Sequence, residues 1–283
     1  MFSKLFLSIS KIAFASILFC LFVSCQNGID AFTNTDTIDE RAKFCDVKPR
    51  ADIGEKYAIV VITDIHLERG NSDMEDFVSF IDSYEFGSAK KAYCIVMGDI
   101  ANGGKVSEYE KYLEFRTELE AQGWQVFCTV GNHDTYASGD YGRNYMKVID
   151  FSTFFRIKQP ETSLYVVDTG DGTLGTKQFN RLEKEMKADG NKKLVFSHYA
   201  PYPDDVHYSL LNDTESAKLL SLYSKENVAF VFSGHTHIHN EKTFGKFRSV
   251  SVGSIFHDEE VRNFAILFVD EKANSFNCVS VDF

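Results

Sequence analysis

The chain has 283 residues, of which 44% are hydrophobic and 14% aromatic, and this composition excludes a disordered protein. Its formal net charge is −11 at pH 7, and such an acidic surface repels the phosphate backbone of nucleic acids. We therefore expect no nucleic-acid partner and a chain that folds into one large domain. Composition leaves the oligomeric state open.

The N-terminal segment is typical of a secretory signal peptide. Residues 1–11 carry two lysines and no acidic residue, and residues 12–23 are an apolar run too short for a typical transmembrane helix. The run ends in LFVSC, with Ser24 before Cys25, which resembles the lipobox of bacterial lipoproteins. The resemblance implies that residues 1–24 are removed, that Cys25 is lipidated, and that the protein is a membrane-anchored lipoprotein of the bacterial cell envelope, facing outside the cytoplasm. A plain secretory signal, which gives a secreted or periplasmic protein, and an uncleaved anchor are the alternatives.

Residues 25–51 are mostly polar and show no periodicity, so we predict a lipid-anchored tether there and a domain over residues 52–283. Apolar, β-branched runs predict buried strands at residues 56–63, 91–98, 124–131, 163–168, 192–198 and 228–234. Helical spacing predicts helices at residues 71–86, 105–123, 175–188 and 212–226. This alternation indicates α/β layers with largely parallel strands. The tail, with runs at 246–256, 263–270 and 275–283, predicts three consecutive antiparallel strands.

Polar side chains follow five of the predicted strands. They are Asp64 and His66, Asp99, Asn132 with His133 and Asp134, His198, and His235 with His237. Ligand sites of open α/β sheets lie at the carboxyl ends of the strands, so these side chains are expected at one edge. A single aspartate there usually caps a helix or turn, but the joint pattern favours a metal site. Imidazole, carboxylate and amide groups without a thiolate suit borderline metal ions such as Mn, Fe or Zn.

The ordered motifs DIH, GD, GNHD, a lone His198 and GHTH resemble the five-part signature of calcineurin-like metallophosphoesterases. The resemblance covers the chain from about residue 57 onward. It implies a four-layer α/β/β/α sandwich of two mixed β-sheets flanked by helices. GNHD followed by GHTH looks more like the phosphodiesterase branch than the large protein phosphatases.

The resemblance also implies roles for individual residues. Asp64, His66 and His237 would hold one metal ion, Asn132, His198 and His235 would hold the other, and Asp99 would bridge both. His133 would not bind metal; it would face the substrate phosphate and help stabilise charge or protonate the leaving oxygen, with Asp134 orienting it. Glycines precede Asp99, Asn132 and His235, and we expect them to let the chain turn sharply off each strand.

The function expected from these features is hydrolysis of a phosphate ester, diester or monoester, by a metal-bound hydroxide at a dinuclear centre. The substrate would be a phosphorylated small molecule or a lipid-linked one. Asn102 and Tyr136 are candidate substrate contacts, although Asn102 suits an Asn-Gly turn and Tyr136 suits simple packing. The alternatives are a phospholipid or sugar-nucleotide hydrolase at the membrane, and a catalytically silent binding protein with the same fold.

Overall fold

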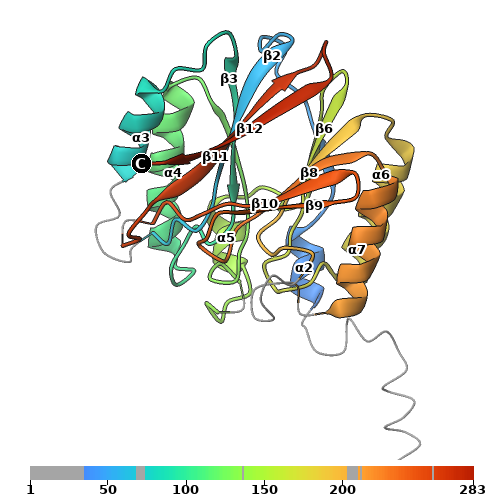
Figure 1. Ribbon diagram of the computed structural model, residues 1–283. Helices are drawn as coiled ribbons and strands as arrows, with labels where there is room; N and C mark the ends of the chain where they lie inside the picture. The colour runs from blue at the N-terminus through green and yellow to red at the C-terminus, as the bar shows by residue number, and fades with distance from the viewer. Residues whose placement is uncertain (1–34, 68–73, 136, 203–209, 211, 257) are drawn as a thin grey trace, which may run out of the picture.

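The computed structural model describes residues 35–67, 74–135, 137–202, 210, 212–256 and 258–283. Two mixed β-sheets lie face to face between outer helices, as Figure 1 shows. The expected α/β/β/α sandwich is thus confirmed. The predicted signal peptide and Cys25 lie outside the described residues.

The larger sheet contains seven strands. In spatial order they are β1 (Cys45–Val47), β5 (Phe155–Lys158), β6 (Thr162–Val166), β7 (Lys192–Phe196), β8 (Val228–Ser233), β10 (Phe247–Ser251) and β9 (Asn240–Phe244). Strands β6, β7, β8 and β10 run parallel to one another, whereas β5 and β9 are antiparallel to their inner neighbours. The carboxyl ends of β7 and β8 therefore lie at the same edge of this sheet.

The smaller sheet contains five strands. In spatial order they are β12 (Ser275–Asp282), β11 (Asn263–Asp270), β2 (Lys56–Ile62), β3 (Lys90–Met97) and β4 (Gln125–Thr129). Strands β2, β3 and β4 are parallel, and β11 pairs antiparallel with both β2 and β12. Six consecutive residues of β2 are buried, because the strand is central in its sheet and covered on both faces.

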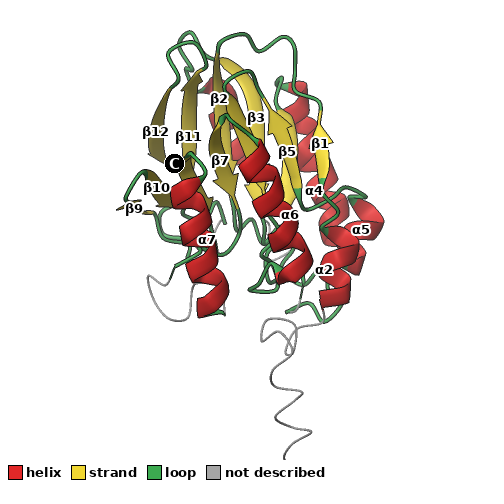
Figure 2. Ribbon diagram, turned by 90° about the vertical axis from the view of Figure 1, so that its right-hand side faces the viewer, coloured by secondary structure: helices red, strands yellow, loops and turns green. Residues whose placement is uncertain are grey.

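Helices cover both outer faces of the sandwich. They are α2 (Thr35–Arg41), α3 (Met74–Ser83), α4 (Val106–Ala121), α5 (Arg143–Val148), α6 (Gly175–Ala188) and α7 (Asp213–Lys225). Figure 2 shows α6 and α7 in front of the larger sheet, and Figure 1 shows α3 and α4 on the opposite side of the molecule. The amide groups at the start of α7 are capped by the side chain of Asn212, as expected for a helix that begins there.

The core between the two sheets consists mainly of apolar side chains. Ile59 and Ile95 of the smaller sheet belong to the same buried cluster as Leu194 and Phe232 of the larger one, each fully removed from solvent. Burial of one such side chain stabilises the fold by about 1.5–3 kcal/mol. This packing fixes the two sheets relative to each other, and with them the strand ends that carry the polar residues.

The predicted boundary between tether and domain at residue 52 is wrong. Helix α2 packs Ile38 into the core beside α6, and β1 pairs in parallel with β5. Seven helical residues and three strand residues are too short to show a clear period, which explains why composition alone suggested a tether. The folded unit therefore includes residues 35–51.

The expected run of three antiparallel strands at the C-terminus is also wrong in part. Strands β11 and β12 form the predicted antiparallel hairpin, but β10 is parallel to β8 and lies in the other sheet. Its antiparallel partner is β9, an edge strand whose mostly exposed NEKTF sequence gave no apolar pattern. The chain thus crosses between sheets after β10.

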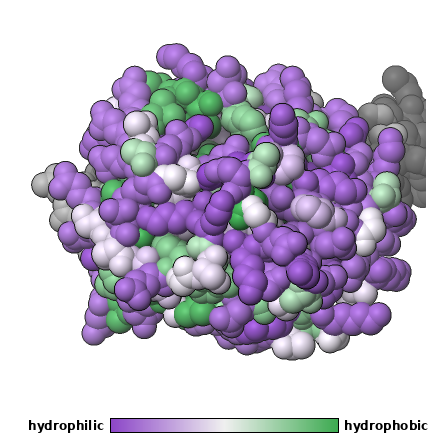
Figure 3. Space-filling view, turned by 90° about the horizontal axis from the view of Figure 1, so that it is seen from above, coloured by the Kyte–Doolittle hydropathy of each residue, from purple (hydrophilic) through white to green (hydrophobic). Residues whose placement is uncertain are grey.

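One face of the molecule is mainly polar. Seen from above, it is largely hydrophilic with separate hydrophobic areas, in keeping with the acidic composition (Figure 3). No helix within the described ranges has the length and apolar character needed to span a bilayer.

Candidate metal centre

The carboxyl ends of strands from both sheets meet at one site. All seven predicted metal ligands follow such strands: Asp64 and His66 after β2, Asp99 after β3, Asn132 after β4, His198 after β7, and His235 and His237 after β8. The donor atoms of the six histidines and aspartates among them fall into overlapping groups, and the members of each group lie within 4.8 Å of one another. The structure therefore brings together the residues that the sequence singled out, although their binding of metal is a separate claim.

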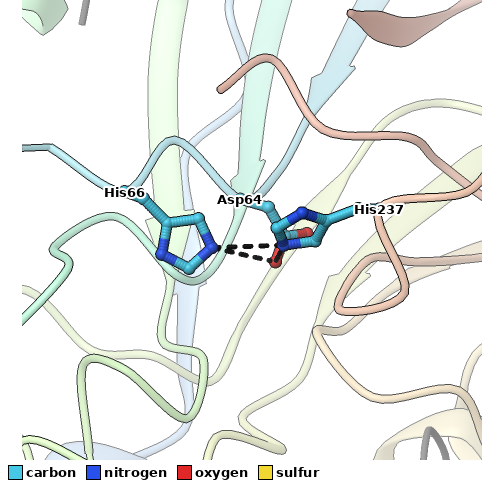
Figure 4. Close-up of side chains that lie close together, drawn as sticks. All are labelled: Asp64, His66 and His237. Atoms are coloured by element: carbon cyan, nitrogen blue, oxygen red, sulfur yellow. Dashed lines mark hydrogen bonds and ion pairs between the residues drawn. The ribbon is translucent and has the colours of Figure 1, made fainter. Parts of the chain in front are cut away.

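The first group consists of Asp64, His66 and His237, whose side chains converge in Figure 4. The Nε2 atoms of the two histidines lie 3.2 Å apart, and Asp64 Oδ1 lies 3.2 Å from His237 Nε2 and 3.8 Å from His66 Nε2. Two imidazole nitrogens and a carboxylate oxygen thus face one point. That is the donor set of a site for a divalent cation.

The second group consists of Asp99, His198 and His235, with Asn132 beside them. His198 Nε2 lies 3.1 Å from Asn132 Oδ1 and 3.5 Å from Asp99 Oδ2. The same Asp99 Oδ2 lies 3.8 Å from His66 Nε2, which belongs to the first group. Asp99 therefore stands between the two groups and is buried with only 2% of its side chain exposed.

A ring nitrogen of His133 also lies within 4.8 Å of His66 and Asp99. The ring of His133 meets that of His66 edge to face, with the centroids 4.6 Å apart. The structure thus places His133 beside the predicted metal ligands; its assignment to the substrate, not to a metal ion, stays a prediction.

The backbone at this edge is unusually strained. Five of the seven predicted ligands have positive φ angles: Asp64 (54°), His66 (48°), Asp99 (48°), His235 (71°) and His237 (57°). A non-glycine residue in this left-handed region costs on the order of 1–3 kcal/mol. Such a residue turns the chain sharply, so β2, β3 and β8 are each followed by a sharp turn that carries predicted ligands.

The three glycines that precede ligands have different roles. Gly98 has a φ of +93° and does turn the chain, as expected. At Gly131, a Cβ atom would lie 2.2 Å from Asp99 Oδ1, and at Gly234 it would lie 2.0 Å from Thr63 Oγ1. These two glycines allow neighbouring strand ends to approach closely, which brings the seven predicted ligands into one site.

Hydrogen bonds orient the histidine rings. His198 Nδ1 lies 2.9 Å from the carbonyl oxygen of Met97, and His133 Nδ1 lies 2.7 Å from that of Asn102. A carbonyl accepts only from an N–H group, so Nδ1 carries the proton and Nε2 is left to bind a metal ion or substrate. Asn102 therefore acts at the site through its main chain, and its predicted contact with substrate stays a prediction.

Glu259 is a residue of the site that the sequence analysis missed. Its Oε1 lies 2.5 Å from His237 Nδ1, so this carboxylate fixes the ring of one predicted ligand. The only signal was a short acidic run, DEE at residues 258–260, which follows a predicted strand but has no motif spacing.

The predicted role of Asp134 in orienting His133 is wrong. Its buried carboxylate accepts hydrogen bonds from the amides of Gly131, Ile100 and Ala101, at 2.9, 3.2 and 3.0 Å, and from the hydroxyl of Tyr109 at 3.1 Å. Asp134 therefore ties the turn after β3 to the turn after β4. It stabilises the backbone that carries Asp99 and Asn132.

Burial and charge separate the histidines into two classes. Burial lowers the pKa of His66 to about 4, and nearby histidines add to the effect. Burial also lowers the pKa of His235 to about 4. Both rings are neutral at pH 7 and present lone pairs, which is the state that a metal ligand requires.

The other two histidines are held charged by carboxylates. Burial opposes a charge on His198, but Asp99 and Asp64 outweigh it and raise the pKa to about 9. Burial is likewise outweighed at His237, whose pKa the carboxylates of Asp64 and Glu259 raise to about 9. In the metal-free protein these two protons neutralise part of the carboxylate charge, a task that metal ions perform when bound.

The donor set fits metal ions. Asp64 Oδ1 is buried, and no group in the described part of the chain makes a well-aligned hydrogen bond to it, although His237 Nε2 lies 3.2 Å away. A buried carboxylate oxygen is costly in a folded protein unless a cation meets it, and without metal the protonated ring of His237 is the cation nearby. The orphaned oxygen points to the same place as the imidazoles of the first group. Tyr136, the other predicted substrate contact, lies outside the described residues.

Sequence comparisons agree with this arrangement. The family model for calcineurin-like phosphoesterases matches residues 57–239, well over half of the chain. A protein of Fibrobacter succinogenes named "Probable cyclic nucleotide phosphodiesterase" is 26% identical over 62% of this chain and 71% of its own length. A protein of the same description from Xenorhabdus bovienii is 27% identical over 63% of this chain and 78% of its own length.

Comparison with solved structures supports the fold. A dimetal phosphatase from Danio rerio superimposes with a TM-score of 0.59, at 14% identity, over 80% of this chain and 95% of its own. The sandwich of two mixed sheets is therefore shared with a protein of very different sequence. At this identity the likeness concerns the fold alone.

Proposed function

Since this chain belongs to the calcineurin-like phosphoesterase family and is a metal-dependent phosphoesterase, we propose that it hydrolyses a phosphodiester with two metal ions that share Asp99. The observation that carries the proposal is the position of Asp99 Oδ2, which lies 3.8 Å from His66 Nε2 and 3.5 Å from His198 Nε2. One carboxylate thus faces both donor groups. The preference for a diester is supported by the two phosphodiesterase-named relatives.

We assign Asp64, His66 and His237 to one metal ion and Asn132, His198 and His235 to the other, as in the sequence-based hypothesis. Two such ions, when bound, neutralise charge on the phosphate oxygens and lower the pKa of a bound water. The donor atoms are held in place before metal binds, because hydrogen bonds to Nδ1 fix the rings of His198 and His237. The complete set of donors argues against the alternative of a catalytically silent binding protein.

His133 is our candidate for the proton donor to the leaving oxygen. Its Nδ1 is engaged by the carbonyl oxygen of Asn102, which leaves Nε2 for the substrate. The ring lies beside His66 and Asp99, two of the predicted metal ligands. A group held in this way can transfer a proton while its orientation stays fixed.

We further propose that the protein is anchored in the bacterial envelope through lipidated Cys25 and acts on phosphorylated molecules outside the cytoplasm. The proposal rests on the apolar segment of residues 12–23 and on the LFVSC sequence that ends it. Hydrolysis of a phospholipid or sugar nucleotide at the membrane is the other possible outcome of a substrate test.

Hydrolysis by the purified protein tests the catalytic proposal. After loading with Mn²⁺, the wild type should hydrolyse bis(p-nitrophenyl) phosphate faster than p-nitrophenyl phosphate, and Asp99→Asn should hydrolyse neither. Cyclic nucleotides, a phospholipid and a sugar nucleotide would then be compared as substrates. Equal activity of wild type and Asp99→Asn would refute the shared role of Asp99.

Metabolic labelling with a fatty acid tests the anchor. The wild type should incorporate label and sediment with membranes, and Cys25→Ala should do neither. Label on the Cys25→Ala variant would contradict the assignment of the acylated residue.

A further inference from the structure

Arg41, at the C-terminal end of α2, is completely buried between two carboxylates. Its Nε donates to Asp168 Oδ2 at 2.7 Å, and its Nη2 donates to Asp171 Oδ2 at 2.8 Å and to Asp168 Oδ1 at 3.2 Å. Asp168 also accepts from the hydroxyl of Thr153 at 2.6 Å. Arg41 lies outside residues 57–239, the segment that the family model matches.

The turn held by Arg41 touches two segments of the metal centre. Thr135 lies three residues after Asn132, and its hydroxyl donates to the carbonyl oxygen of Gly170 at 2.9 Å. The amide of Tyr199, which directly follows His198, donates to Thr169 Oγ1 at 2.9 Å. The 168–172 turn therefore contacts the chain beside two predicted ligands.

The approach of this turn is close. A Cβ atom at Gly170 would lie 3.0 Å from the carbonyl oxygen of Gly131 and 3.0 Å from the side chain of Thr135. Arg41 also donates from Nη1 to the carbonyl oxygen of Tyr141, at 3.2 Å, in the segment that follows GNHD. Arg41 thus bonds both to the 168–172 turn and to the segment that follows GNHD.

We propose that Arg41 is a positioning residue for one half of the dinuclear centre, the half formed by Asn132, His198 and His235. The inference rests on the proposed function, because it presupposes that these residues bind a metal ion. A buried ion pair is weak support for a role in stability alone, because desolvation of the charges offsets their attraction. What a guanidinium between two carboxylates supplies is geometry, since its planar fork fixes both partners at once.

The contacts are asymmetric, and this makes the inference testable. The 168–172 turn bonds to the chain beside Asn132 and His198, whereas the other donor group is held from behind by Glu259 through His237. Disturbing Arg41 should therefore weaken one metal site and spare the other. Disturbing Glu259 should do the opposite.

Arg41→Lys in the full chain is the test. Lysine keeps the charge but cannot form the fork to both Asp168 and Asp171. Mn²⁺ binding is measured by titration calorimetry at constant pH. Arg41→Lys should bind Mn²⁺ about tenfold more weakly than the wild type at one of two sites and with unchanged affinity at the other. Glu259→Ala should weaken the opposite binding step.

Arg156→Lys is the matched control. Arg156 forms an ion pair with Asp46 at 2.7 Å and lies 3.5 Å from Glu185 and Asp189, and its side chain is only 11% exposed. Within the described part of the chain, Arg156 forms no hydrogen bond or ion pair with the turns that carry the predicted ligands. Its replacement should leave both Mn²⁺ affinities within twofold of the wild type.

The outcomes are distinct. If Arg41→Lys binds both ions like the wild type, or loses affinity equally at both sites, Arg41 does not position one half of the centre. If Arg41→Lys is unfolded by circular dichroism, Asp171→Asn, which retains the pair of Arg41 with Asp168, must show the same one-site loss. If the wild type binds fewer than two Mn²⁺ ions, the proposed function itself fails, and the inference falls with it.

Discussion

Replacement of Glu259 should weaken one metal site without unfolding the protein. In Glu259→Ala, His237 loses the carboxylate that lies 2.5 Å from its Nδ1, so the ring is free to rotate and to change tautomer. Outer partners of metal-bound histidines typically contribute about 10–100-fold to metal affinity. The side chains of His237 and Glu259 are 26% and 30% exposed, so solvent screens the pair, and we expect the lower end of this range. The expected loss is about tenfold, which is ~1.4 kcal/mol.

The assay is calorimetric titration of the metal-free protein with Mn²⁺, together with hydrolysis at increasing Mn²⁺ concentration. Half-maximal activity should require about tenfold more metal, whereas activity at saturating metal should approach that of the wild type. Glu259→Gln keeps an acceptor oxygen but loses the charge, so its Mn²⁺ requirement should lie between those of the wild type and Glu259→Ala. Glu260→Ala, at the exposed neighbouring residue, is the control and should have the Mn²⁺ affinity of the wild type. Wild-type Mn²⁺ affinity in Glu259→Ala would refute the orienting role of this carboxylate.

Three further predictions concern the frame of the site. Asp134→Ala leaves buried backbone donors unpaired and should lower the free energy of unfolding by about 3 kcal/mol in urea titrations; a loss below 1 kcal/mol would contradict the bracing role. Gly131→Ala should abolish Mn²⁺ binding, since its Cβ would overlap Asp99, whereas Gly190→Ala, where no atom lies within 4 Å, should bind normally. The pKa values of His198 and His237, both raised to about 9, mean that each ring is protonated at neutral pH and must release a proton to bind metal. Apparent Mn²⁺ affinity should therefore rise from pH 6 to pH 9, and calorimetry in buffers of different ionisation enthalpy should detect the released protons; a pH-independent affinity would contradict this.

The gathering of the predicted ligands at one edge could be foreseen because these residues follow strong local signals in the sequence. Asp64, Asp99 and His198 each come within two residues of the end of a buried apolar strand, so periodicity and sheet topology place them at one edge. The fold class followed from the same runs. The close approach at Gly131 and Gly234 was not predictable in detail, since it depends on how the ends of different strands meet.

The supporting residues were missed because their partners are distant in sequence. Arg41 and Asp168 are 127 residues apart, and Glu259 and His237 are 22 apart with strands β9 and β10 between them. Helix α2 and strand β1 escaped notice for a related reason, because elements of seven and three residues gain their stability from tertiary contacts. Asp134 was misassigned since its position beside His133 in sequence says nothing about where its side chain points.

Crystals of the protein soaked in Mn²⁺ offer the most direct test of a dinuclear centre that shares Asp99. Anomalous scattering should reveal two peaks, one among Asp64, His66 and His237 and one among Asn132, His198 and His235, with Asp99 bound to both. A single peak, or two peaks of which only one contacts Asp99, would contradict the account.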